Sequence, residues 1–349
     1  MAKALMAALL AGATLSAPHI VGAQERAPAS VEQFYKGRTV NLFVANQGGG
    51  RYDLNARLVA RHLGRFIPGD PNVVVQNLAG GGGLVMANRM YNTADRDGAT
   101  LAVLQPGAAQ TAIQGVPTAK FDPTKFNWLG SVSSFGDDAD LLIVSPRHKA
   151  QSAADLRAGV SATLGSGTPG STNLTFALIG RDVLGLDLRI VRGYNSAPFV
   201  PMEAGEIDGQ VVLMSSIKST HPDLWRSQAF KALVQFGRST RHPELPDTPT
   251  ARELVTDPEN MPLLEFAELA FFMSLPVIAP PGVPPDRLAA LQQAFVAMTG
   301  DADFRREAEA MHVDLSPISG AQVLALIRKA AATPGKIIAR YNEIVPPGE

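Results

Sequence analysis

The sequence of 349 residues contains no cysteine. Without a thiol, the chain cannot form a disulfide scaffold, a cysteine nucleophile, an iron–sulfur cluster or a cysteine-ligated zinc site. Its six histidines are scattered, with no HExxH motif and no two histidines four residues apart. The sequence therefore predicts no cysteine- or histidine-ligated metal site and no cofactor.

The chain also lacks an excess of charge of either sign. It has 31 Lys and Arg against 32 Asp and Glu, for a formal net charge of −1. A balance of this kind gives no electrostatic basis for binding nucleic acid or an anionic membrane surface. We therefore expect no nucleic-acid partner.

The first 23 residues are typical of a cleavable export signal. Lys3 provides a short, positively charged N-terminal region, and residues 4–17 form an apolar run of small and aliphatic residues. Residues 21–23, Val-Gly-Ala, fit the small-residue pattern of a cleavage site. The apolar run is only ~14 residues before Pro18, whereas a membrane-spanning helix needs ~20. Residues 1–23 are thus expected to be removed, which leaves a soluble periplasmic protein.

The mature chain is too long for one hydrophobic core, because single cores stop growing at about 250–300 residues. Short β-branched runs alternate with amphipathic stretches throughout, which is typical of an α/β fold. The first and last parts share this pattern, and the middle is self-contained. We expect two lobes, each a mostly parallel sheet flanked by helices, with a ligand cleft between them. The expected boundaries are 24–130 and 251–349 for lobe 1 and 131–250 for lobe 2.

Several expected strands end in loops rich in glycine or hydroxyl groups that open toward a helix. The first amides of a helix lack intrahelical partners, the helix dipole is positive there, and glycine permits close approach to the backbone. Loops at the carboxyl edges of two facing sheets would therefore suit a carboxylate, although each glycine alone can also simply turn the chain. The loops are 48–50, 80–83, 166–168 and 194–196.

Enzyme motifs are weak or missing. Residues 165–170 match G-x-G-x-x-G, but Pro169 stiffens the turn and Asp187 precedes the next expected strand instead of ending it. No Walker sequence and no G-x-S-x-G elbow occur, so no catalytic residue is predicted. The acidic segment Asp137-Asp138-x-Asp140 is compatible with a Ca²⁺ site or with a solvated loop.

An ordered set of short segments over about 40–345 resembles the Bug-type extracytoplasmic solute receptors of tripartite tricarboxylate transporters. The segments 50–53 and 215–219 are closer to a divergent branch of that family. The matching segments are 48–53 (GGGRYD), 73–82 (VVVQNLAGGG), 98–101 (GATL), 205–209 (GEIDG), 245–249 (LPDTP) and 279–284 (APPGVP).

The resemblance implies a monomeric, non-enzymatic receptor that closes on a small organic carboxylate and delivers it to membrane permease subunits. In this family, backbone amides and bridging waters from both lobes hold the carboxylate. Carried over to this chain and combined with its other cleft loops, the candidate ligand-binding residues are Gln47, Gly48, Gly49, Gly50, Arg51, Tyr52, Gly81, Gln105, Ser166, Gly167, Thr168, Ser171, Thr172, Tyr194, Asn195 and Ser215.

The ligand itself remains open. Family members that bind amino or dicarboxylic acids often carry Asp-Asn where this chain has residues 210–215, QVVLMS, without an acid. This difference disfavours an amino acid and leaves aliphatic di- or tricarboxylates and aromatic carboxylates as candidates. Arg51 and Arg192 could pair with a second carboxylate or be solvated. A ligand-sensing receptor for a two-component system and, less favoured, an exported enzyme are the alternative functions.

Overall fold

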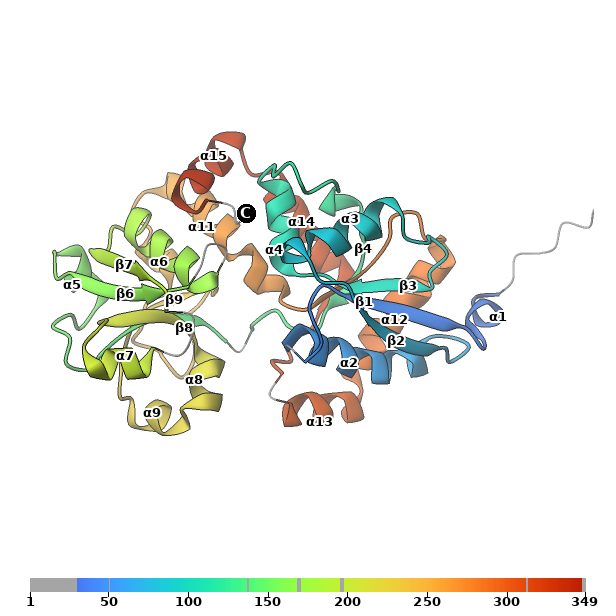
Figure 1. Cartoon of the computed structure of the whole chain (residues 1–349), viewed down its shortest axis with the longest axis horizontal. Helices are drawn as coiled ribbons and strands as arrows, with labels where there is room; N and C mark the ends of the chain where they lie inside the picture. Colours follow the sequence, from blue (N-terminus) through green and yellow to red (C-terminus); the bar gives the residue numbers. More distant parts are fainter. Residues whose placement is uncertain are drawn as a thin grey trace, which may run out of the picture.

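The computed structural model describes residues 30–49, 51–136, 138–167, 171–194, 198–311 and 313–346. The expected export signal lies outside these ranges. Two mixed α/β sheets, one of six strands and one of five, form two lobes that lie side by side (Figure 1). None of the helices in the described ranges combines the length and apolar character needed to cross a bilayer.

The six-stranded sheet combines strands from both ends of the chain, in the order β11-β4-β10-β3-β1-β2. β1 to β4 are mutually parallel, and β10 and β11 are antiparallel to them. The strands are β1 (Thr39–Val44), β2 (Asn72–Asn77), β3 (Thr100–Val103), β4 (Asn127–Ser131), β10 (Pro276–Ala279) and β11 (Ile318–Ser319). The helices of this lobe are α1 (Val31–Tyr35), α2 (Arg51–Leu63), α3 (Leu84–Asn92), α4 (Pro106–Ile113), α12 (Pro285–Gly300), α13 (Ala302–Ala310) and α14 (Gly320–Ala331).

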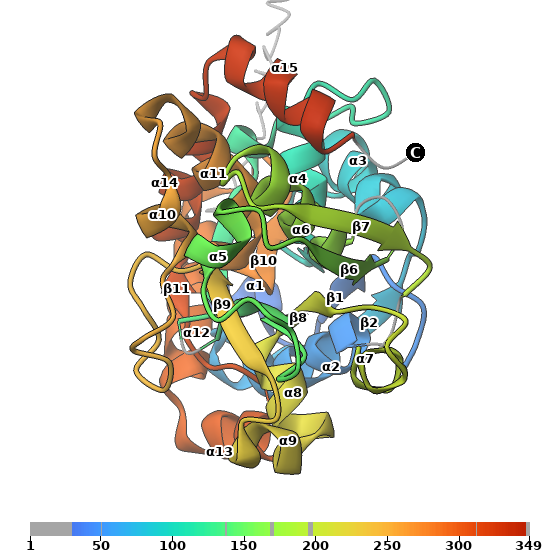
Figure 2. The same cartoon turned by 90° about the vertical axis from the view of Figure 1, so that its left-hand side faces the viewer.

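The five-stranded sheet uses only the middle of the chain, in the order β7-β6-β8-β5-β9. Four of these strands are mutually parallel, and β5 is antiparallel to them. The strands are β5 (Asp140–Val144), β6 (Ala162–Ser166), β7 (Leu188–Arg192), β8 (Gly209–Leu213) and β9 (Lys231–Phe236). The helices around it are α5 (Ala153–Arg157), α6 (Thr172–Asp182), α7 (Phe199–Ala204), α8 (Met214–Thr220), α9 (Pro222–Ser227), α10 (Ala251–Leu254), α11 (Met261–Glu268) and α15 (Gly335–Ile344). Figure 2 looks onto this lobe, with α8 and α9 at one end and α15 at the other.

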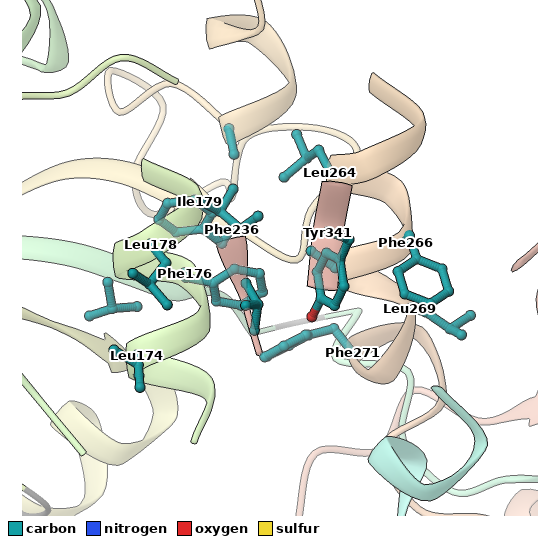
Figure 3. Packing of buried hydrophobic residues seen from close by; sticks show 14 of the residues in the cluster. Leu174, Phe176, Leu178, Ile179, Phe236, Leu264, Phe266, Leu269, Phe271 and Tyr341 are labelled. Carbon is teal, nitrogen blue, oxygen red and sulfur yellow. The ribbon is translucent and has the colours of Figure 1, made fainter. Parts of the chain in front are cut away.

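A buried aromatic cluster joins the two lobes where the chain crosses between them. Phe176 of α6 stacks on Phe236 of β9, with ring centroids 4.7 Å apart. Phe271 lies in the segment by which the chain returns to the first lobe. Its ring centroid is 5.0 Å from that of Phe176 and 5.5 Å from that of Phe135, which lies in the segment that leaves the first lobe. Figure 3 shows Tyr341 of α15 beside this cluster. α15 also contacts α6 and α11, so the C-terminal helix covers the junction.

The expected two-lobed α/β fold is confirmed. Three details of the sequence interpretation need correction. The sequence pattern predicts a loop at residues 214–216, but these residues begin α8, because Met214 and Ile217 share one buried helix face. The pattern also predicts one helix over residues 320–341, but this segment forms two helices, since Pro334 has no amide proton and disfavours helical geometry in the residue before it. β4 was not predicted as a strand, although all but its first residue are buried.

A glycine pair tests the packing of α14 on the first sheet. A Cβ built on Gly320 would overlap the carbonyl oxygen of Trp128 in β4, whereas one on Gly335 meets nothing within 4 Å. We predict that Gly320→Ala lowers the free energy of unfolding by about 1–3 kcal/mol through overpacking. Gly335→Ala should leave that free energy unchanged or raise it by up to about 1 kcal/mol. Urea denaturation measures both, and equal stabilities for the two variants would contradict the packing described.

Candidate functional site

The loops after β1, β2 and β3 meet at the carboxyl edge of the six-stranded sheet, as predicted. They surround an open hollow of about 520 Å³ lined by residues 45–48, residues 79–82 and Gln105. The Gln105 Nε2 atom donates to Asn46 Oδ1 at 2.9 Å, which links the first and third loops. Four candidate residues, namely Gln47, Gly48, Gly81 and Gln105, therefore lie together around this hollow.

The glycine loop after β1 is held by a carboxylate from its own lobe. The Asp53 side chain is 2% exposed, and its Oδ2 accepts from the Gly49 N–H at 2.8 Å. Arg57 and Asn77 donate to the same carboxylate, at 3.0 Å and 2.9 Å. These hydrogen bonds, from Arg57 first and then from Gly49 and Asn77, outweigh burial and lower the Asp53 pKa to about 2. The Gly49 amide, expected to face the ligand, is thus engaged within the loop.

The loop after β6 is ordered by Asn173 in a similar way. The Asn173 Oδ1 atom accepts from the Gly167 N–H at 3.1 Å and from the Ser171 hydroxyl at 2.7 Å. Ser166 is fully buried, and its hydroxyl donates to the Val191 carbonyl at 3.3 Å. Thr172, another candidate residue, begins α6 and lines a cavity between the lobes.

Two candidates at the end of β7 lie away from that cavity. Arg192 is exposed, and the Tyr194 ring packs against the hydrophobic core of its own lobe. The Tyr194 hydroxyl donates to Glu206 at 3.4 Å, and its carbonyl accepts from Gln210 at 2.9 Å. Gly50, Thr168, Asn195 and the Arg51 side chain lie outside the described residues.

A cavity of about 380 Å³ lies between the lobes, and both lobes contribute to its wall. The N-terminal turn of α4 reaches it with Pro106 and Gly107, and that of α6 with Thr172 and Thr175. Two helix N-termini from opposite lobes thus face one cavity and would stabilise a negative charge there. The lining residues are Tyr52, Gln105, Pro106, Gly107, Gln110, Phe135, Asp140, Thr172, Thr175, Phe176, Leu213, Ala267, Ala270, Phe271, Ser274 and Tyr341.

A buried Gln–Tyr pair, missed by the sequence interpretation, adds a hydrogen-bond donor to this cavity. The Gln110 Nε2 atom donates to the Tyr341 hydroxyl oxygen at 3.1 Å and to the Phe266 carbonyl at 3.0 Å. Because the Tyr341 oxygen accepts from Gln110, its own proton remains to donate. Burial raises the Tyr341 pKa above its usual value, which keeps that proton in place. No local pattern could reveal Tyr341, because only the return of α15 brings it here.

The cavity also contains a buried acid that the sequence interpretation did not place there. Asp140 is 4% exposed, begins β5 and lies directly opposite Leu213 of β8 in the sheet. Asp138 is 1% exposed, and its Oδ1 accepts from the amides of Ala139 and Ser215. The solvated-loop interpretation of this acidic segment is therefore wrong for both residues, while Asp137 lies outside the described residues. Within the described ranges, no group of three or more metal-ligating side chains is suitably placed to bind a metal ion.

A second, wider hollow of about 680 Å³ adjoins the first and shares Leu213 with it. It lies between α2 of one lobe and α8 of the other, and Ser215 is the candidate residue that it contains. Leu54 on its wall is 46% exposed. This hollow forms a second part of the space between the lobes.

Two α/β lobes with a cavity between them define the fold of a periplasmic solute-binding protein, and the predicted resemblance is confirmed at this level: the fold is that of the TctC- and Bug-type proteins. A TctC solute-binding protein from Polaromonas is 18% identical, with a TM-score of 0.68 over 88% of this chain and 99% of the other. MatC from Rhodopseudomonas palustris, with bound malate, is 22% identical, with a TM-score of 0.55 over 88% and 99%. An adipate-bound R. palustris protein is also 22% identical, with a TM-score of 0.56 over 88% and 96%. No family model and no curated protein matches the sequence.

The Asp53 network gives a prediction that depends on pH. Asp53→Asn should lower the free energy of unfolding by about 1–3 kcal/mol at pH 7, because it removes charge-assisted hydrogen bonds to a buried carboxylate. The folded-state pKa of Asp53 is lowered from 3.8 to about 2, so the wild-type advantage is complete above pH 4. It should then disappear as the pH falls through 2.

Urea denaturation between pH 7 and pH 2 measures this difference. Asp223→Asn is the control, because Asp223 pairs with Arg226 on the surface and its side chain is 91% exposed. A surface pair of this kind contributes little to stability. If Asp53→Asn and Asp223→Asn are equally stable at pH 7, the Asp53 network does not stabilise the loop.

Proposed function

We propose that this protein is a periplasmic receptor that captures a small organic carboxylate between its lobes and delivers it to a membrane transporter of the tripartite tricarboxylate type. The observation that carries this proposal is the convergence of the α4 and α6 N-termini, one from each lobe, on a single cavity. The positive ends of two helix dipoles, with amide groups of the first helical turns, favour a carboxylate without requiring a cationic side chain.

The role of each part of the cavity follows from its chemistry. The Gly107 amide of α4 and the first-turn amides of α6 would bind the carboxylate oxygens, and the Tyr341 hydroxyl would donate a further hydrogen bond. Gln110 would hold that hydroxyl in position. Phe135, Phe176 and Phe271 would pack against the carbon skeleton of the ligand. Because both lobes would contact one ligand, binding would favour a closed arrangement of the lobes.

Several further properties belong to this proposal. Residues 1–23 act as the export signal, the mature protein is monomeric, and its partners are permease subunits in the membrane. The proposed lobe boundaries are 24–130 and 251–349 for lobe 1 and 131–250 for lobe 2, except that α10, α11 and α15, from the last range, pack with the five-stranded lobe. Malate and adipate in two proteins of the same fold support a carboxylate ligand of this size.

A thermal-shift screen of small organic acids, with and without an amino group, tests the proposal. A ligand that binds only the folded state adds RT ln(1 + [L]/Kd) to its stability, about 2.7 kcal/mol at a hundredfold excess over Kd. We expect at least one acid to raise the Tm in this way. If no small acid raises the Tm, the proposed function is wrong.

Removing the Tyr341 hydroxyl locates the site. Tyr341→Phe should weaken binding of the acid found in the screen about tenfold, because a hydrogen bond to a charged group is lost. Tyr91→Phe is the matched control, since Tyr91 packs edge-on against Phe126 and is absent from the cavity wall. Isothermal titration calorimetry measures both affinities. Equal affinity in the two variants would place the ligand elsewhere.

A further inference from the structure

A residue with a strained backbone lies on the wall of the interlobe cavity. Phe135 has a φ of +49°, in the left-handed region that is unfavourable for a bulky residue with a Cβ atom. It is 8% exposed and lines the cavity, with its ring against that of Phe271. Phe135 belongs to the segment by which the chain leaves the first lobe, here called the exit segment (residues 132–136). Because strain of this kind persists only where the surroundings enforce it, neighbouring segments hold Phe135 in place.

Residues 314–316, between α13 and β11, bind the exit segment on both sides of Phe135. The Ser316 Oγ atom accepts from the Ser134 amide at 2.9 Å and from the Gly136 amide at 3.0 Å. The Ser134 hydroxyl in turn donates to the Ser316 carbonyl at 2.7 Å. The backbone before and after Phe135 is therefore bonded to one residue of the first lobe.

The Asp314 carboxylate determines the direction of these hydrogen bonds. Its Oδ2 atom accepts from the Ser316 hydroxyl at 2.6 Å and from the Ser133 hydroxyl at 2.6 Å. The Ser133 oxygen itself accepts from the Phe135 amide at 3.3 Å. Since a hydroxyl group has one proton and two acceptor positions, both serines can accept from the exit-segment amides while they donate to Asp314. The carboxylate thus orients both hydroxyl groups toward the backbone around Phe135.

The position of the Phe135 ring affects the shape of the ligand cavity. The ring packs on Phe271, which packs on Phe176 of α6 (Figure 3), and the α6 N-terminus faces the same cavity. A change in the Phe135 backbone would therefore withdraw apolar surface from the ligand and loosen the packing beside α6. Asp314 lies outside the wall of this cavity and lines the adjoining hollow of about 680 Å³.

We propose that Asp314 is a positioning residue for the ligand. Through Ser133 and Ser316 it holds Phe135 in the left-handed conformation, and this conformation places the phenyl ring against the carbon skeleton of the acid. This proposal rests on the proposed function, and it adds that the shape of the site is set by a carboxylate outside the cavity wall.

A double-mutant cycle with Phe135→Ala tests this role. The probe is the acid that raises the Tm most among glutarate, citrate, 4-methylpentanoate and 3-phenylpropanoate, and calorimetry measures its affinity. Phe135→Ala should weaken binding about tenfold, because apolar contact is lost. Asp314→Ala should weaken it about fivefold in the wild-type background but less than about twofold in the Phe135→Ala background, because the ring that Asp314 positions is then absent.

Two further variants separate positioning from a general loss of stability. Asp314→Asn keeps an oxygen atom that can accept from both serines, so its affinity should stay within about twofold of the wild-type value. Asp122→Ala is the matched control, because Asp122 Oδ1 accepts from the amide and the hydroxyl of Thr124, at 2.9 Å and 2.6 Å, and Asp122 is absent from the cavity wall. It should lower the Tm and leave the affinity unchanged.

The outcomes separate this proposal from the one on which it depends. Wild-type affinity in folded Asp314→Ala refutes the positioning role. An equal loss of affinity in both backgrounds also refutes it, since Asp314 would then act without Phe135. In either case the carboxylate receptor stands. Should Asp314→Ala not fold, Ser316→Ala replaces it in the cycle, with the same expected coupling to Phe135→Ala.

If no acid binds the wild-type protein, the proposed function fails and the role of Asp314 toward a ligand fails with it. A crystal structure of Asp314→Ala then decides whether Asp314 holds the exit segment. We expect Phe135 to leave the left-handed region in that variant. An unchanged φ and ring position would show that Asp314 does not position Phe135.

Discussion

The stacking of Phe176 on Phe236, with Phe271 packed against both lobes, is the contact on which the rest of the arrangement depends. Phe176 belongs to α6, so the same helix anchors the junction and presents its N-terminus to the cavity. Phe271 lies in the chain segment that returns to the first lobe. Close packing of this kind is sensitive to small changes in volume, and it fixes where the α6 N-terminus lies relative to α4.

The cavity between the lobes combines three kinds of surface. Helix N-termini provide positive potential, Asp140 provides a buried carboxyl group, and the phenylalanines provide apolar area. In two of the loops expected to bind the ligand, a glycine amide is already bonded within its own lobe: that of Gly49 to Asp53 and that of Gly167 to Asn173. We therefore propose that these loops support the rim, and that the deeper ligand contacts fall to α4, α6 and Tyr341.

Much of the fold could be predicted because local patterns determine it. Short β-branched runs such as 39–44 and 188–191 lie in strands, and the loops at 45–49 and 79–83 lie at one sheet edge, as the strand–loop–helix pattern requires. Of the candidate residues, Tyr52, Gln105 and Thr172 line the interlobe cavity. Asp140 and Tyr341 could not be found this way, because strand pairing across β5 and β8 and the return of α15 bring them there. Such long-range contacts leave no periodic signal in the sequence.

A crystal structure of the protein with a small organic acid that raises its Tm tests the central claim most directly. We predict that the ligand carboxylate lies between the N-termini of α4 and α6, within hydrogen-bonding distance of the Gly107 amide and the Tyr341 hydroxyl. A ligand in another hollow, or in this cavity with its carboxylate away from both helix N-termini, would contradict the account.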